Sequence, residues 1–223
     1  MRIRAPSTPA ASSVPLPRRV FESLIALIAP DVCAACDART AVMTVFCRAC
    51  ASTLVRATDT HAGAIAPFVY GGAIAAAIGS LKYDQRVDRA RPLSHLLLGA
   101  LEPLRASPPT HVVPVPLHAS RAALRGFNQS ALLASPVARA LGARFAPSIL
   151  TRTRDTAAQA TLARAHRLRN VSQAFVAHAP LDGARVLLVD DVRTTGATLD
   201  ACAAAMRAVG ACDIRSLVLA CAD

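Results

Sequence analysis

Short apolar runs alternate with longer amphipathic stretches along most of the chain, and this alternation predicts strands separated by helices. The clearest run is Val186 to Val189, which lies between Gly183 and a pair of acids. A continuous aliphatic run is typical of a strand buried on both faces of a parallel sheet. Strands are predicted at 68–70, 111–117, 144–150, 174–176, 186–189 and 213–220, and helices at 73–81, within 84–105, at 130–141 and from 197 to Gly210. The pattern predicts an α/β fold with a mostly parallel, doubly wound sheet.

The first sixty residues follow a different pattern. Residues 1–18 are rich in Pro, Ser and Ala and are expected to form a disordered basic arm. Apolar residues at helical spacing (Phe21, Leu24, Ile25 and Ile28) predict an amphipathic helix at 19–29. We therefore expect three parts: the arm at 1–18, a small module at 19–60 and the α/β domain at 61–223. No apolar run reaches the ~20 residues of a membrane helix, so we expect no membrane span.

The predicted strand 186–189 leads directly into candidate chemistry. Asp190 and Asp191 follow it, at the strand end where open α/β sheets place their ligands. Thr194, Thr195, Gly196, Ala197 and Thr198 then open the next helix. Free N–H groups at a helix start, with threonine hydroxyls, can hold a phosphate, while the acids suit sugar hydroxyls or a metal. The alternative is an ordinary strand–turn–helix with a threonine cap and a solvated acid pair.

The charge of the chain adds a basic surface to this picture. The net charge is +11, and nine arginines stand against one acid between Arg121 and Asn170. A solvated helix face would interleave acids, so this stretch favours a phosphate-binding surface. The arginines singled out for phosphate or DNA are Arg121, Arg125, Arg152, Arg154 and Arg167. The scarcity of aromatic residues in this stretch argues against a platform on which bases stack.

Four of the seven cysteines form two C-x-x-C pairs, Cys33 with Cys36 and Cys47 with Cys50. Two such pairs supply the four thiolates of a tetrahedral, structural Zn²⁺ site. The alternatives are four unrelated core cysteines or a redox pair. The remaining cysteines, Cys202, Cys212 and Cys221, fall on apolar faces and are expected in the core.

The ordered set of motifs resembles one family. L-K-Y at 81–83, V-P-V-P-L at 113–117, R-x-x-x-R-G-F-N-Q at 121–129 and D-D-V-x-T-T-G-A-T at 190–198 follow the paired cysteines, with R-x-R-x-T-x-x-Q-x-x-L at 152–162 and R-x-x-N-V at 167–171 between the last two. This order is similar to the ComF (GntX-like) family of phosphoribosyltransferase-fold proteins. The last motif also resembles the signature with which type I phosphoribosyltransferases bind phosphoribosyl pyrophosphate (PRPP).

The resemblance implies a type I phosphoribosyltransferase fold behind a zinc-binding module. It places Asp190 and Asp191 on the ribose hydroxyls, as candidate catalytic residues, and Thr194 to Thr198 around the 5′-phosphate. It places the loop Val115, Pro116, Leu117 and His118 at the pyrophosphate, where Mg²⁺ would bind. It further implies a cytoplasmic protein that helps to handle single-stranded DNA, together with DNA-uptake machinery, in naturally competent bacteria.

Two functions of different classes remain open from the sequence. The first is transfer of a 5-phosphoribosyl group from PRPP, or binding of ribose 5-phosphate, with an unidentified acceptor. An acid near the ribose would support the positive charge that develops during such a transfer. The second is a non-catalytic module that binds single-stranded DNA and keeps the pocket as a sensor or structural core. The complete acid and threonine motif favours the first function, and the arginines favour the second.

Overall fold

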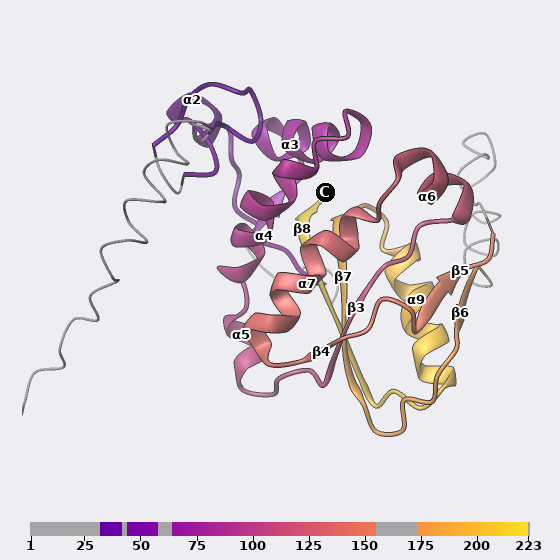
Figure 1. Cartoon of the computed structure of the whole chain (residues 1–223). Helices are drawn as coiled ribbons and strands as arrows, with labels where there is room; N and C mark the ends of the chain where they lie inside the picture. Colours follow the sequence, from indigo (N-terminus) through magenta and orange to yellow (C-terminus); the bar gives the residue numbers. More distant parts are fainter. Residues whose placement is uncertain (1–31, 42–43, 58–63, 155–173, 223) are drawn as a thin grey trace, which may run out of the picture.

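A computed structural model describes residues 32–41, 44–57, 64–154 and 174–222 (Figure 1). The expected arm at 1–18 and the expected helix at 19–29 lie outside these ranges. Within them no helix is both long enough and apolar enough to cross a membrane.

Six parallel strands form the central sheet. They are β1 (Ala64–Ile65), β2 (Phe68–Val69), β3 (His111–Pro114), β4 (Arg144–Phe145), β7 (Arg185–Arg193) and β8 (Asp213–Cys221). Their order is β1-β8-β7-β3-β4, and β2 also pairs with β8. The predicted parallel α/β architecture is confirmed, and β7, which carries the two acids, lies in the middle of the sheet.

The two faces of the sheet bury separate cores. Leu187 and Val189 of β7 pack with α3 (Gly72–Tyr83), α4 (Ala90–Leu98) and α7 (Gln129–Leu141). Val186 and Leu188 pack on the other face with α9 (Ala197–Ala208), β5 (Leu150–Arg152) and β6 (Phe175–Ala177). Successive residues of a strand point to opposite faces, so one aliphatic run supplies both cores. Figure 1 shows α9 on the opposite side of the strands from α4 and α7.

Three predicted elements differ from the structure. The segment 84–105 is η2 (Val87–Arg89), α4 and α5 (Glu102–Arg105), because Gln85 has φ 54° and Pro103 fits only a first helical turn. The segment 144–150 divides between β4 and the start of β5, which pairs antiparallel with β6. The acids Asp190 and Asp191, expected after their strand, lie inside β7 because its pairing with β8 continues to Arg193.

β3 pairs with both β7 and β4 and is an interior strand, although it ends in Pro114. The pairing of β3 with β4 ends at Val112. Proline has no backbone N–H to donate, and Pro114 lies beyond the end of β4, so no hydrogen bond to β4 is lost there. The prediction that Cys202, Cys212 and Cys221 lie in the core is confirmed for Cys202 and Cys221, which are buried. It is wrong for Cys212, which is exposed.

The paired-cysteine segment is joined to the α/β domain by buried contacts. Cys33 and Ala34 belong to the same core cluster as α3 and α4. Arg89, only 2% exposed, donates from Nη1 to the Cys33 carbonyl at 2.6 Å and forms an ion pair with Asp37. The hydroxyl oxygen of Thr53 accepts the Ala73 N–H at 2.9 Å, at the N-terminal end of α3. The segment therefore braces the helix layer on this face.

Replacing Arg89 tests this junction. In Arg89→Met the Cys33 carbonyl loses the guanidinium and keeps the Asp37 N–H as a donor, and the ion pair of Arg89 with Asp37 is also lost; together these losses cost about 2 kcal/mol. Urea unfolding should therefore show a lower midpoint. The matched control is Arg105→Met, because Arg105 and Glu102 form an exposed ion pair on α5 that contributes little. Equal midpoints for the two variants would contradict the proposed role of the junction.

Candidate functional site

The carboxyl end of β7 holds two acids in different surroundings. Asp191 is 3% exposed, and its Oδ1 lies 2.7 Å from Nζ of Lys82, near the end of α3. The second oxygen of Asp191 is buried and has no hydrogen-bond partner among the described residues. A buried polar atom without a partner is uncommon in a folded protein. The arrangement leaves one acceptor of Asp191 available for a ligand.

Asp190 is held by α7 rather than by α3. The hydroxyl of Ser130, which is 1% exposed, donates to Oδ1 of Asp190 at 2.7 Å, and the Asp191 N–H donates to the same oxygen at 2.9 Å. Burial, together with the neighbouring charge of Asp191, raises the pKa of Asp190 to about 7. Titratable groups with strongly shifted pKa values gather at functional sites. The pair therefore contains one ion-paired carboxylate and one carboxyl group that titrates near neutral pH.

A glycine turn follows β7 and starts α9. Gly196 has φ 83° and is the residue before the first turn of α9. A Cβ added at Gly196 would lie 2.7 Å from Nη2 of Arg193, so the guanidinium packs directly against the turn. Thr194 and Thr195 are exposed, whereas Ala197 and Thr198 are half-buried. The free N–H groups of α9, three threonines and one cation gather here, which suits an anion.

The loop Val115, Pro116, Leu117 and His118 lies beside the acids. The Val115 N–H donates to the Val189 carbonyl, one residue before Asp190, at 2.9 Å. The Asn128 side chain donates to the Val115 carbonyl at 3.0 Å and caps α7 through the Ser130 N–H. His118 caps α6 (Ala119–Arg125), since its ring nitrogen accepts from the Ser120 N–H. The structure thus places the start of this loop against the strand that carries the two acids.

The predicted basic residues divide into two groups. Arg125 on α6 donates to Gln129 and lies over the ring of Tyr83, 5.8 Å from its centroid. Arg121 lies on the same helix. The Arg152 guanidinium lies over the ring of Phe175, 5.5 Å from its centroid, and the backbone of Arg152 forms an isolated β-bridge with His118. Arg154 is exposed and follows β5. Arg167 lies outside the described residues.

Three contacts of this site were not predicted. Lys82 was noticed within the L-K-Y motif, and it is the only lysine of the chain, but nothing local links it to Asp191. Ser130 and Arg193 carried no signal beyond their positions next to motifs. The contacts of Lys82 and Ser130 depend on how distant elements pack, which a single sequence does not reveal. Arg193 contacts Gly196 within the same turn, through the local shape of the backbone.

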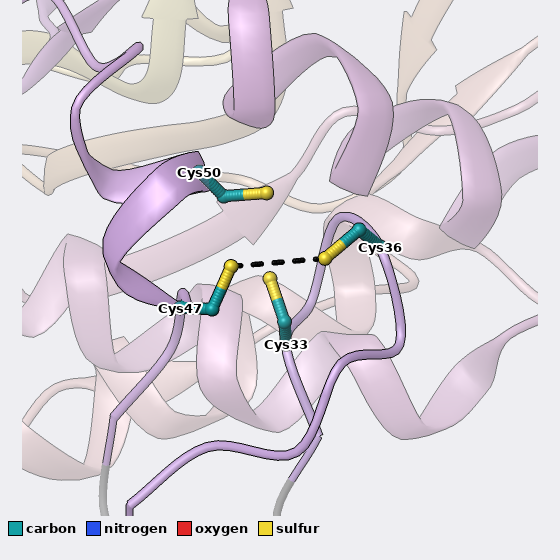
Figure 2. A group of neighbouring side chains, drawn as sticks. All are labelled: Cys33, Cys36, Cys47 and Cys50. Atoms are coloured by element: carbon teal, nitrogen blue, oxygen red, sulfur yellow. Dashed lines mark hydrogen bonds between the residues drawn. The ribbon is translucent and has the colours of Figure 1, made fainter.

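The four cysteines of the paired motifs point toward one centre (Figure 2). Cys33 and Cys36 come from a turn, and Cys47 and Cys50 flank and enter the short helix α2 (Arg48–Ala51). Their sulfur atoms all lie within 4.8 Å of one another, with Cys36 and Cys47 at 3.7 Å. Tetrahedral zinc with sulfur at ~2.3 Å separates its ligands by about 3.8 Å.

The chemistry of the cluster also suits a cation. The contact with Cys36, together with burial, raises the pKa of Cys50 to about 12. Neighbouring thiols therefore resist joint ionisation unless a positive ion neutralises them. All four are free of disulfides. The cluster is compatible with a structural zinc ion, and since all four ligands come from the protein, no position is left open for chemistry.

Comparisons with known proteins agree with the motifs. Residues 128–222 match the phosphoribosyl transferase domain family. The chain is 40% identical over 136 residues to DNA utilization protein YhgH of Escherichia coli, covering 58% of this chain and 59% of that protein. It is 36% identical over 110 residues to Competence protein F of Haemophilus influenzae, covering 48% of each. The resemblance to the ComF family is confirmed.

These matches are partial. The chain spans about 59% of the length of the YhgH proteins that it matches. Among solved structures, a purine phosphoribosyltransferase from Pyrococcus horikoshii overlaps with 63% of this chain and 76% of its own, at 20% identity and a TM-score of 0.39. The matched domain begins at the cap of α7 and includes β7, both acids and α9.

Metal analysis tests the cysteine cluster. Purified protein is expected to contain one zinc per chain, and Cys47→Ser should lose most of it, because three thiolates and a hydroxyl bind zinc less tightly. Cys212→Ser is the control, since this thiol is exposed and outside the cluster. Full zinc occupancy in Cys47→Ser would show that the cluster does not hold the metal.

The raised pKa of Asp190 predicts a pH-dependent stability. Between 3.8 and about 7 the folded protein keeps a proton on Asp190 that the unfolded chain releases. Folding therefore loses stability as the pH rises through this window and loses no more above it. In Asp190→Asn this loss is absent, so the variant should gain stability over the wild type from pH 4 to 7 in urea titrations. A difference between the two that is constant with pH would contradict the shift.

Proposed function

Because the chain carries a phosphoribosyl transferase domain and is a homologue of DNA utilization protein YhgH and Competence protein F, we propose that the carboxyl end of β7 binds PRPP or ribose 5-phosphate. The observation that carries this proposal is the buried, unpartnered oxygen of Asp191. It lies on the strand that ends at an anion-binding turn. Carboxylates repel phosphate, so the acids suit the ribose diol and the turn suits the 5′-phosphate.

The roles of the residues follow from this placement. Asp190 and Asp191 accept hydrogen bonds from the ribose hydroxyls. The residues Thr194, Thr195, Gly196, Ala197 and Thr198 hold the 5′-phosphate, with Arg193 beside them. The loop Val115, Pro116, Leu117 and His118 faces the pyrophosphate. Mg²⁺ would bind with that pyrophosphate and neutralise its charge as it leaves.

Transfer of the ribosyl group generates positive charge on the sugar. A carboxylate next to the ribose stabilises that charge more in the transition state than in the substrate. Asp191 is fixed for this role, because Lys82 and the strand hold its position before a ligand arrives. Asp190, whose pKa is about 7, can keep or release a proton when the diol or a cation approaches.

The names of the two relatives support a second proposal. They connect this family with DNA utilization and competence, and we propose that this chain handles single-stranded DNA in the cytoplasm, through Arg121, Arg125, Arg152, Arg154 and Arg167. The specific observation in its favour is Arg152 over Phe175, beside exposed Arg154. The division into an arm (1–18), a zinc module (19–60) and the transferase-like domain (61–223) remains part of this proposal.

Calorimetry with PRPP and Mg²⁺ tests the first proposal. In Gly196→Ala the new methyl group meets Arg193 and the backbone is strained at φ 83°, so the affinity for PRPP should fall at least about tenfold. Gly142→Ala is the matched control. Gly142 has φ 63° and ends α7, but a methyl group there meets nothing within 4 Å. The control should bind PRPP as the wild type does.

A further variant separates the two halves of the pocket. Asp191→Asn should retain inorganic phosphate while losing affinity for ribose 5-phosphate. If the wild type fails to bind PRPP at millimolar concentration, the ligand proposal is wrong. If the protein then binds single-stranded DNA with an affinity that falls steeply as salt is added, DNA binding is left as the function of the chain.

A further inference from the structure

The segment from Val115 to Asn128 has its two ends tied together. The chain leaves β3 after Pro114, runs through α6 and returns at Asn128, the cap of α7. There the Asn128 side chain donates from Nδ2 to the Val115 carbonyl at 3.0 Å, across 13 positions of the sequence. α6 itself has no buried residue, so the contacts at the base of this segment matter for where it lies.

Val115 is fixed through both of its backbone groups. Its N–H donates to the Val189 carbonyl of β7 at 2.9 Å, and its carbonyl accepts from Asn128. Two prolines flank it, Pro114 and Pro116. A proline fixes its own φ and restricts the residue before it to extended backbone. The chain is therefore stiff here, and its direction beyond β3 depends on the two hydrogen bonds of Val115.

The same asparagine also fixes Ser130. The Oδ1 atom of Asn128 accepts the Ser130 N–H at 3.0 Å, which caps α7. The hydroxyl of Ser130, which is 1% exposed, donates in turn to Oδ1 of Asp190 at 2.7 Å. A side-chain amide is a donor at its nitrogen and an acceptor at its oxygen. The two ends of one amide thus hold the loop and the residue that contacts Asp190.

We propose that Asn128 is a positioning residue of the pocket, which fixes the spacing between the loop 115–118 and Asp190. This inference rests on the proposed function, because it takes the loop to meet the pyrophosphate and Asp190 to meet the ribose. A ligand that carries both groups gains from a fixed spacing, since less conformational freedom is lost when it binds. A ligand that carries the ribose without the pyrophosphate does not need the loop.

Calorimetry with PRPP and Mg²⁺, and with ribose 5-phosphate, tests the proposal. Asn128→Ser keeps an uncharged cap for α7 and loses the amide that reaches Val115. The affinity for PRPP should fall about tenfold, because the loop is no longer fixed before the ligand arrives. The affinity for ribose 5-phosphate should stay unchanged, because Ser130 keeps its place at Asp190. Asn128→Thr, which also caps without an amide, should behave in the same way.

Two further variants separate the two ends of the amide from the rest of the fold. Ser130→Ala removes the hydroxyl from Asp190 and leaves the loop bond in place, so the affinities for PRPP and ribose 5-phosphate should fall by the same factor. The matched control is Thr110→Val. The Thr110 hydroxyl bonds to the Arg185 carbonyl at 3.0 Å, at the other end of β7 and about 16 Å along the strand from Asp190. This control should keep both affinities.

The outcomes distinguish this inference from the proposed function. If Asn128→Ser binds PRPP as tightly as the wild type does, the inference alone is overturned. Equal losses of affinity for both ligands in that variant also overturn it, because they show a general loosening of α7 rather than a displaced loop. Urea unfolding detects such loosening as a midpoint as low as that of Asn128→Ala, which has no cap. A wild type that binds neither ligand refutes the proposed function and this inference with it.

Discussion

Two adjacent carboxyl groups buried at the end of one strand are the constraint on which the rest of this structure depends. Burying a charge is costly unless a partner compensates it, and two like charges side by side increase the cost. The protein solves the problem differently for each acid. Asp191 has the ammonium of Lys82, whereas Asp190 has the Ser130 hydroxyl and a pKa near 7. The two solutions come from different helices, so α3 and α7 must both reach the end of β7.

Contacts away from the two acids fix the positions of α3 and α7. Thr53 meets the start of α3, and Arg89 ties the cysteine segment to the end of η2. Asn128 caps α7 and at the same time holds the Val115 loop. The cysteine segment thus contacts the start of α3, the helix whose Lys82 reaches Asp191. A metal that orders the cluster would also order the helix that delivers Lys82, which gives a structural site a part in the geometry of the pocket.

The features predicted best from the sequence are those formed by residues that are close together along the chain. The aliphatic run, the two acids and the threonine–glycine turn are contiguous, and the structure keeps them together in β7 and α9. The four cysteines were also predicted, because their paired spacing brings the sulfur atoms together wherever the segment packs. The strand pairings were harder: β3 is an interior strand although it ends in Pro114, because its pairing with β4 stops at Val112. Lys82 and Ser130 needed the packing itself, since no pattern in the sequence connects them to acids on a distant strand.

The ion pair of Lys82 has a practical consequence because of the composition of the chain. The sequence contains 25 basic residues of the lysine and arginine type, and Lys82 alone is a lysine. Its ammonium group is thus the one side-chain amine of the protein, and it lies at 20% exposure against Asp191. Reagents that acylate amines leave guanidinium groups intact, so Lys82 is the one side-chain amine that they would acylate. The rate of that modification reports on the end of β7 in the unaltered protein, with no label introduced by mutagenesis.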